Sequence, residues 1–187
     1  KEAGPPIMPY QPENLWRSVG RNQPKWVAAE NDDRFRRGVY VIWKRAAPYP
    51  SFVNFDAPNR GSCTVQRSRS NTPIQALTLL NDPAYLEMAL GLADRILSES
   101  PSSDDDQRIA FGFQLALSRS PSNKEVEIVK SLLENERSKI QQQPLLAEDR
   151  IREPARVVQV RSTNRQELAA WLSVANTLLN LDETMTR

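Results

Sequence analysis

The sequence contains no histidine among its 187 residues. This absence excludes a Ser-His-Asp triad, a Cys-His dyad, a histidine-ligated zinc ion and a histidine acid/base pair from this chain. Cys63 is the single cysteine, so no internal disulfide and no cysteine-based metal cluster can form. The side chains left for catalysis are the carboxylates, lysine, tyrosine, serine and Cys63 itself.

Several sequence motifs are also missing. The chain has no C-x-x-C-H haem attachment motif, and it has neither G-x-x-x-x-G-K-[ST] nor G-x-G-x-x-G, which form phosphate-binding loops. We therefore predict no cofactor and no metal in this chain. No apolar run approaches the roughly 18 residues of a membrane-spanning helix, so no membrane span is expected in it. The sequence does not open with a signal-peptide pattern, and we expect the start KEAG at residues 1–4 to be an internal point of a longer protein.

Charge is nearly balanced overall but unevenly distributed. The formal net charge of +2 is too small to indicate a nucleic-acid partner. Residues 1–75 contain 12 basic and 6 acidic side chains, whereas residues 76–187 contain 13 basic and 17 acidic ones. One interpretation of this asymmetry is a basic face on the first half that could attract an anionic partner, but charge asymmetry of this size is common and favours pairing between the two halves.

The first 72 residues predict a long, irregular region rich in proline and arginine. They hold eight of the 14 prolines and three of the four tryptophans. Residues 37–44 are rich in β-branched and aromatic side chains, which favours a short strand, with a helical turn as the alternative. Residues 46–72 are predicted to be loop.

The rest of the chain carries repeated helix start signals. Each is a polar capping residue, or a proline in the first turn, followed by apolar residues at helical spacing. The helix starting at Pro73, for example, places Ile74, Leu77 and Leu80 at this spacing. The signals are Thr72-Pro73, Asp82-Pro83, Ser103 with Asp104, Asp105 and Asp106, and the capping boxes Ser122/Glu125 and Thr163/Gln166.

These signals predict a mainly α, helical bundle-like domain. We expect 1–187 to be a fragment of one domain with a loop-rich front at 1–72. Helices occupy 73–142, a linker occupies 143–162, and a C-terminal helix occupies 163–182.

Residues 40–83 form the most distinctive stretch, and it resembles a known family. Its motifs are YxxWKR at 40–45, FDAPNR at 55–60, CTVxRxR at 63–69 and NTPxQALxLLNDP at 71–83. Together with LNLDExxTR at 179–187, they resemble the planctomycete-type PSD-one domain of unknown function (DUF1553). The resemblance spans Tyr10 to Arg187, and we expect the chain to be the C-terminal part of that domain.

The resemblance implies a context rather than an activity. Such domains lie toward the C-terminal side of large exported bacterial proteins, beside a companion unknown domain and a cytochrome-c-like domain. This implies a location outside the cytoplasm, haem c on another domain of the protein, and other domains of the same protein as partners. No catalytic residue can be carried over from the family.

Polar residues in the distinctive stretch are the candidate binding site. Asp56 could act as a general base or bind a cation or sugar hydroxyls, or it could cap a turn that Arg60 ties to a helix. Arg67 and Arg69 are two apart, so in extended backbone they could clamp a sulfate, phosphate or carboxylate, or pin the loop. The candidates are Lys44, Arg45, Asp56, Asn59, Arg60, Arg67 and Arg69.

Other residues receive structural interpretations. Cys63 is expected to be buried and inert, as free cysteines usually are. The alternative is a reactive thiol, which the absence of an activating histidine disfavours. Trp16, Trp26 and Trp43 are assigned to the core, with stacking on sugars as the alternative. The run 104–106 is interpreted as a helix cap, and Glu87 and Asp94 as a solvated helix face.

Two functions remain open. The first is a non-catalytic module for assembly or binding, whose basic, aromatic loop surface contacts a partner domain or an anionic polysaccharide. The second is part of a carbohydrate-active or redox enzyme, with a site around Asp56 and Arg60 that other regions complete. We favour the first, because no complete catalytic set is visible.

Overall fold

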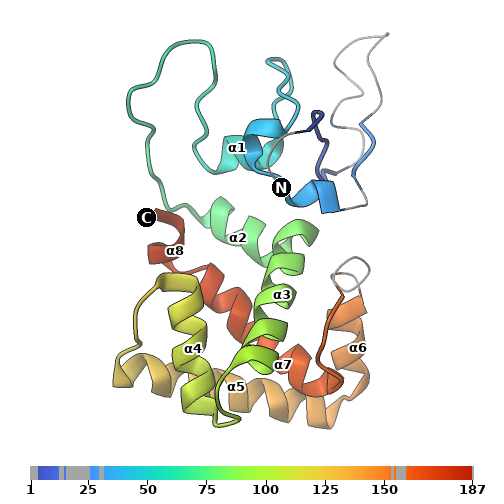
Figure 1. Cartoon of the computed structure of the whole chain (residues 1–187), viewed down its shortest axis with the longest axis vertical. Coiled ribbons are helices and arrows are strands. Elements are labelled where there is room, and N and C mark those ends of the chain that lie inside the picture. The colour runs from blue at the N-terminus through green and yellow to red at the C-terminus, as the bar shows by residue number, and fades with distance from the viewer. Residues whose placement is uncertain are drawn as a thin grey trace. The chain divides into compact units, whose positions relative to one another are not determined.

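The computed structural model describes residues 4–12, 15, 26–29, 32–152, 154 and 159–186 (Figure 1). These residues are mainly α-helical, which confirms the predicted fold class. The chain divides into two compact units, Lys1–Gln75 and Ala76–Arg187, and the division falls within helix α2 (Pro73–Asn81). The prediction of a single domain stays a prediction, and each unit is described by itself.

The first unit contains little regular structure. It holds the 3₁₀ turns η1 (Asp32–Phe35) and η2 (Gly38–Tyr40), the short helix α1 (Pro50–Asn54) and the first residues of α2. Its small core consists of buried and partly buried apolar side chains, most of them aromatic. These are Ile7, Val41, Tyr49, Trp26, Tyr40 and Phe52.

Of the two structures predicted for residues 37–44, the helical turn is confirmed and the strand is wrong for these described residues. Gly38–Tyr40 forms η2, and Val41 makes one isolated bridge with Ile7. The Ile7 amide donates to the Tyr40 carbonyl at 2.9 Å, and the Ile42 amide donates to the Ile7 carbonyl at 3.0 Å. The partner segment contains Pro5, Pro6 and Pro9, which lack amide hydrogens, so the ladder cannot extend.

Aromatic rings organise the rest of this unit. Trp26 stacks on Tyr49 at 6.1 Å, and Phe52 contacts both Tyr49 and Trp43 at 5.4 Å between ring centroids. The Trp26 indole also donates to the Pro9 carbonyl at 2.8 Å. Trp26 and Trp43 therefore pack inside the unit, whereas Trp16 lies outside the described residues.

The second unit is a helical bundle built around α7 (Figure 1). Helix α7 contacts α3, α4, α5, α6 and α8, and eight of its residues are buried. An apolar helix with contacts on this many sides is the expected centre of a core. The helices are α3 (Pro83–Glu99), α4 (Asp105–Leu117), α5 (Asn123–Gln142), α6 (Leu145–Arg152), α7 (Arg165–Leu179) and α8 (Asp182–Thr186). No described helix combines the length and apolar character needed to cross a membrane.

Most predicted helix starts are confirmed. The Asp82 side chain caps α3, Asp104 caps α4, and Ser122 with Glu125 forms the capping box of α5. The prediction for α7 is wrong by one residue, because Asn164 is the cap and accepts from the Glu167 amide at 3.1 Å. Asparagine caps as well as threonine does, and this register lets Glu167 pair with Arg137 of α5.

Helix α2 buries a different side from the one that its apolar spacing predicts. Ile74, Leu77 and Leu80 are exposed, and the buried residues are Gln75 and Leu79. Apolar spacing thus located the helix correctly but not the face that it buries.

The segment predicted as a linker, 143–162, contains α6. Its buried residues Ala147 and Ile151 are four apart, which places them on one helix face. After α6 the chain is attached to α3 by Asp94, whose Oδ1 accepts from the amides of Arg161 and Ser162 at 2.8 Å each. Asp94 is 3% exposed, so the predicted solvated position is wrong for this residue.

Ion pairs connect the helices of this unit. Arg137 of α5 bonds to Asp105 at the start of α4 and to Glu167 at the start of α7. Glu136 is buried and bonds to Lys139, at 2.6 Å, and to Arg150 of α6. Burial raises the pKa of Glu136, but hydrogen bonds from Lys139 and Arg150 together lower it by more. The net pKa lies below the ordinary value, so the carboxylate stays ionised.

Candidate functional site

Residues 57–69 form a long surface loop in the first unit, which we call the arginine loop. Every residue from 58 to 69 is exposed. The loop contains Arg60, Arg67 and Arg69 and no acidic residue. It also carries Cys63, which is exposed rather than buried as predicted.

Hydrogen bonds close the base of this loop. Asp56, in the left-handed conformation with φ 56°, accepts at Oδ2 from the Ser70 amide at 2.8 Å and from the Ser70 hydroxyl at 2.5 Å. Gln75 is 2% exposed and donates to the Asn54 carbonyl at 2.7 Å and to the Ser70 hydroxyl at 3.0 Å. Its Oε1 accepts from the Thr72 amide at 2.8 Å. Both ends of the loop are therefore anchored to α1 and to the start of α2.

The same contacts keep Asp56 ionised. The hydrogen bond from the Ser70 hydroxyl has the largest effect and lowers the pKa of Asp56. Burial raises this pKa, whereas the hydrogen bond from the Ser70 amide and the charge of Arg67 lower it. A carboxylate with a lowered pKa is a weak general base near neutral pH. It remains a good hydrogen-bond acceptor and a fixed negative charge.

Asn59 and Arg60 shape the first part of the loop. The Asn59 Oδ1 accepts from the Gly61 amide at 3.0 Å, which closes a tight local turn. Arg60 has φ 56°, a conformation that costs a non-glycine residue about 1 kcal/mol. Its guanidinium lies 4.9 Å from the Trp43 ring centroid, in a cation–π contact that offsets part of this cost.

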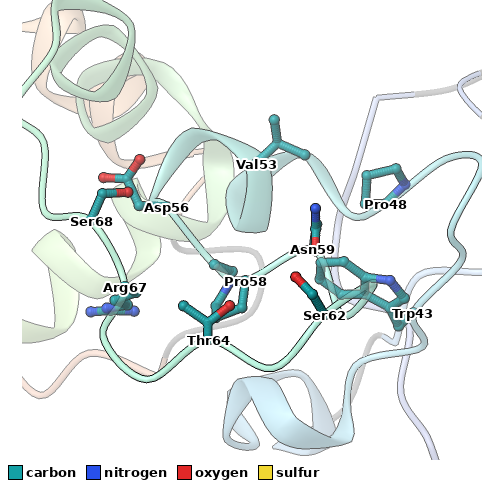
Figure 2. A pocket seen from close by; sticks show the side chains of 11 residues that line it. Trp43, Pro48, Val53, Asp56, Pro58, Asn59, Ser62, Thr64, Arg67 and Ser68 are labelled. Atoms are coloured by element: carbon teal, nitrogen blue, oxygen red, sulfur yellow. The ribbon is translucent and has the colours of Figure 1, made fainter.

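The arginine loop forms one side of a solvent-open pocket of about 420 Å³ (Figure 2). In the figure the loop runs beneath the pocket from Asn59 to Ser68, and α1 contributes Val53 from above. The lining combines one indole ring, a carboxylate, a guanidinium, an amide, three hydroxyls and several small apolar groups. These residues are Trp43, Pro48, Val53, Asp56, Ala57, Pro58, Asn59, Ser62, Thr64, Arg67 and Ser68.

The structure brings three of the seven candidate residues to this pocket: Asp56, Asn59 and Arg67. Arg60 contacts the pocket's Trp43 from outside the lining.

The remaining candidates are not pocket residues. Arg45 and Arg69 are exposed outside the lining, and the ammonium nitrogen of Lys44 is shielded from solvent. Lys44 is thus poorly placed to meet an external anion.

Ser70 and Gln75, whose hydrogen bonds anchor the base of the arginine loop, were not identified from the sequence. The Thr72-x-x-Gln75 spacing is a capping-box pattern and could have predicted the role of Gln75. Ser70 lies 14 residues from Asp56, and no local pattern indicates that pair. Ser62, Thr64 and Ser68 also line the pocket, and loop serines and threonines give no signal of this kind.

The acidic run at 104–106 has structural partners. Asp104 caps α4, Asp105 pairs with Arg137, and Asp106 pairs with Lys130 at 2.8 Å. The capping interpretation is confirmed for Asp104. Within the part of the chain that the structure describes, no group of three or more histidine, cysteine, aspartate or glutamate side chains could hold a metal ion.

Comparison with known families agrees with the motifs of the site. Residues 1–133 match the family described as Protein of unknown function (DUF1553). The chain belongs to this family. All four motifs at 40–83 lie in the matched range, and the resemblance stated from them is confirmed. No curated protein and no solved structure matches the chain. Membership of DUF1553 assigns no activity, so function has to be argued from the site.

Proposed function

We propose that this DUF1553 chain is a non-catalytic binding module whose arginine loop recognises an anionic polysaccharide. The observation that carries the proposal is the loop itself. It is exposed along its length, anchored at its base by Asp56 and Ser70, and basic without any acidic residue. An ordered, exposed loop with charge of one sign attracts ligands of the opposite charge.

Arg67 and Arg69 are the main contacts in this proposal. Both are exposed, and a guanidinium donates two parallel hydrogen bonds to a carboxylate or a sulfate. A chain of acidic sugars presents such groups repeatedly, so it can engage both arginines at once. Arg45 is exposed as well and adds positive charge.

Binding is favoured over catalysis by the state of Asp56. Its pKa lies below the ordinary value, and Ser70 holds the carboxylate in place. These features suit a fixed acceptor better than a group that must take up a proton.

The proposal includes the wider context that the family resemblance implies. The module belongs to a larger exported protein that works outside the cytoplasm. The resemblance also implies that another domain of that protein carries haem c. Other domains of the same protein are its further partners.

The test is binding to dextran sulfate and to polygalacturonate, measured by calorimetry at several salt concentrations. We expect Arg67→Gln/Arg69→Gln to weaken binding about tenfold and to reduce its salt dependence, since two charge-assisted contacts are lost. The matched control is Arg95→Gln/Arg152→Gln, which removes two exposed arginines of the second unit. Absence of binding to both polymers, or an equal loss in the control, overturns the proposal.

A further inference from the structure

We propose that the pocket bounded by Trp43, Asp56 and Arg67 holds one acidic pyranose unit of that polysaccharide. The inference rests on the proposed function and deepens it by naming the group that enters the pocket. The arginine loop supplies attraction for any polyanion, whereas the pocket supplies selectivity for a sugar.

The size and lining of the pocket fit such a unit. A volume of about 420 Å³ lies near the lower end of the range of small-molecule sites, which suits a ligand as small as one sugar ring. Three hydroxyls, from Ser62, Thr64 and Ser68, line it together with an amide and a carboxylate. Short groups that both donate and accept are complementary to the hydroxyls of a pyranose.

Asp56 and Asn59 are suited to bind sugar hydroxyls. A carboxylate offers about four acceptor sites, and the two bonds from Ser70 both go to Oδ2. Asp56 therefore retains acceptor capacity for ligand hydroxyls. Asn59 uses its Oδ1 for the Gly61 amide, so its NH₂ group supplies donors.

Arg67 distinguishes an acidic sugar from a neutral one. It lines the same pocket as Asp56 and is close enough for its charge to lower the pKa of that carboxyl. A ligand with hydroxyls on one side and a carboxylate or sulfate on the other matches this pair of opposite charges. A linear polyanion without hydroxyls would leave Asp56 facing negative charge, which is unfavourable.

Hydrogen bonds fix the loop base and the Asn59 turn before a ligand enters. Asp56 is bonded to Ser70, Ser70 to Gln75, and Asn59 to Gly61. A ligand therefore pays little for ordering the loop. Trp43 forms a wall rather than an open stacking platform, because Phe52 and the Arg60 guanidinium already pack on its ring.

The experiment compares saccharides with a non-sugar polyanion of the same charge. The probes are tetragalacturonate, a sulfated tetrasaccharide and tetraglutamate, each titrated into the full chain. We expect at least one saccharide to bind about tenfold more tightly than tetraglutamate, corresponding to one or two added hydrogen bonds. The double variant Ser62→Ala/Thr64→Val keeps the arginines and is expected to lose this preference.

A matched control variant is Ser103→Ala/Thr163→Val, which alters two exposed residues of the second unit. It is expected to keep the preference unchanged. Equal binding of all three probes overturns the pocket while leaving the arginine loop as a polyanion site. A preference that survives in Ser62→Ala/Thr64→Val also overturns the pocket. If no probe binds at all, the proposed function fails and the pocket fails with it.

Discussion

The two units of the chain are held together by different kinds of interaction. The helical unit buries a mostly aliphatic core between helices, and the starts of α3, α4, α5 and α7 are each marked by a capping side chain. The first unit has a small, mostly aromatic core and depends on side chains that bond to distant backbone groups. Helices therefore form where capping residues and apolar spacing indicate the same structure. The chain is irregular where it is held by a few contacts between residues far apart in the sequence.

Arginine is used differently in the two units. In the helical unit Arg119, Arg137 and Arg150 are each bonded to carboxylates of other segments. In the first unit Arg36 donates to the Pro5 carbonyl and pairs with Asp33, while Arg60 packs on an aromatic ring. The arginine loop contains three arginines and no carboxylate of its own, so its formal charge is positive.

The largest expected effect is in the helical core. Leu90 of α3 is fully buried, and Leu90→Ala is expected to lower the free energy of unfolding by about 3 kcal/mol, because it leaves a cavity. Urea denaturation followed by far-ultraviolet circular dichroism measures this change. Ile128→Ala on the exposed side of α5 is the control, with an expected change within about 0.5 kcal/mol. Equal effects of the two changes would contradict the assignment of the core to this unit.

A smaller effect is expected from the ion pairs of the helical unit. Arg150→Met removes a partner of the buried Glu136 carboxylate and should cost about 2 kcal/mol, less than for a fully buried pair because Lys139 remains. Arg152→Met, in the same helix, breaks an exposed pair with Asp149 and should cost less than about 0.5 kcal/mol. The two variants are compared by thermal and urea unfolding. A cost for Arg152→Met that matches Arg150→Met would mean that burial of Glu136 is unimportant.

The smallest effect on global stability is expected at the loop base. Ser70→Ala removes the hydroxyl that bonds to Asp56 and Gln75, so the arginine loop should open locally while the helices stay intact. Limited trypsin cleavage after Arg67 and Arg69 should become about tenfold faster. The urea midpoint of the helical signal should not change.

The matched change for this comparison is Ser68→Ala, which lines the pocket but leaves the loop base intact. It should be cleaved at the rate of the unchanged protein. Faster cleavage in Ser68→Ala than in Ser70→Ala would show that the loop base does not anchor the loop.

The family, the mainly α class and most helix starts could be predicted from the sequence. Capping residues and first-turn prolines act within about four residues, so Asp82, Asp104 and Ser122 could be recognised without a structure. Motif order at 40–83 was likewise enough to identify DUF1553. Residue type and position in the polar stretch at 40–83 are enough to mark Asp56, Asn59 and Arg67 as candidates.

Contacts between residues far apart in the sequence could not be predicted and are visible only in the folded chain. Asp94 accepts from amides 67 and 68 residues away, which explains both its burial and the attachment of the chain after α6. The strand expected at 37–44 failed because its partner segment contains prolines. The pocket depends on Trp43, Asp56 and Arg67 being brought together by the loop base. Such contacts form when the chain closes a loop between residues far apart in the sequence. No pattern of neighbouring side chains specifies them.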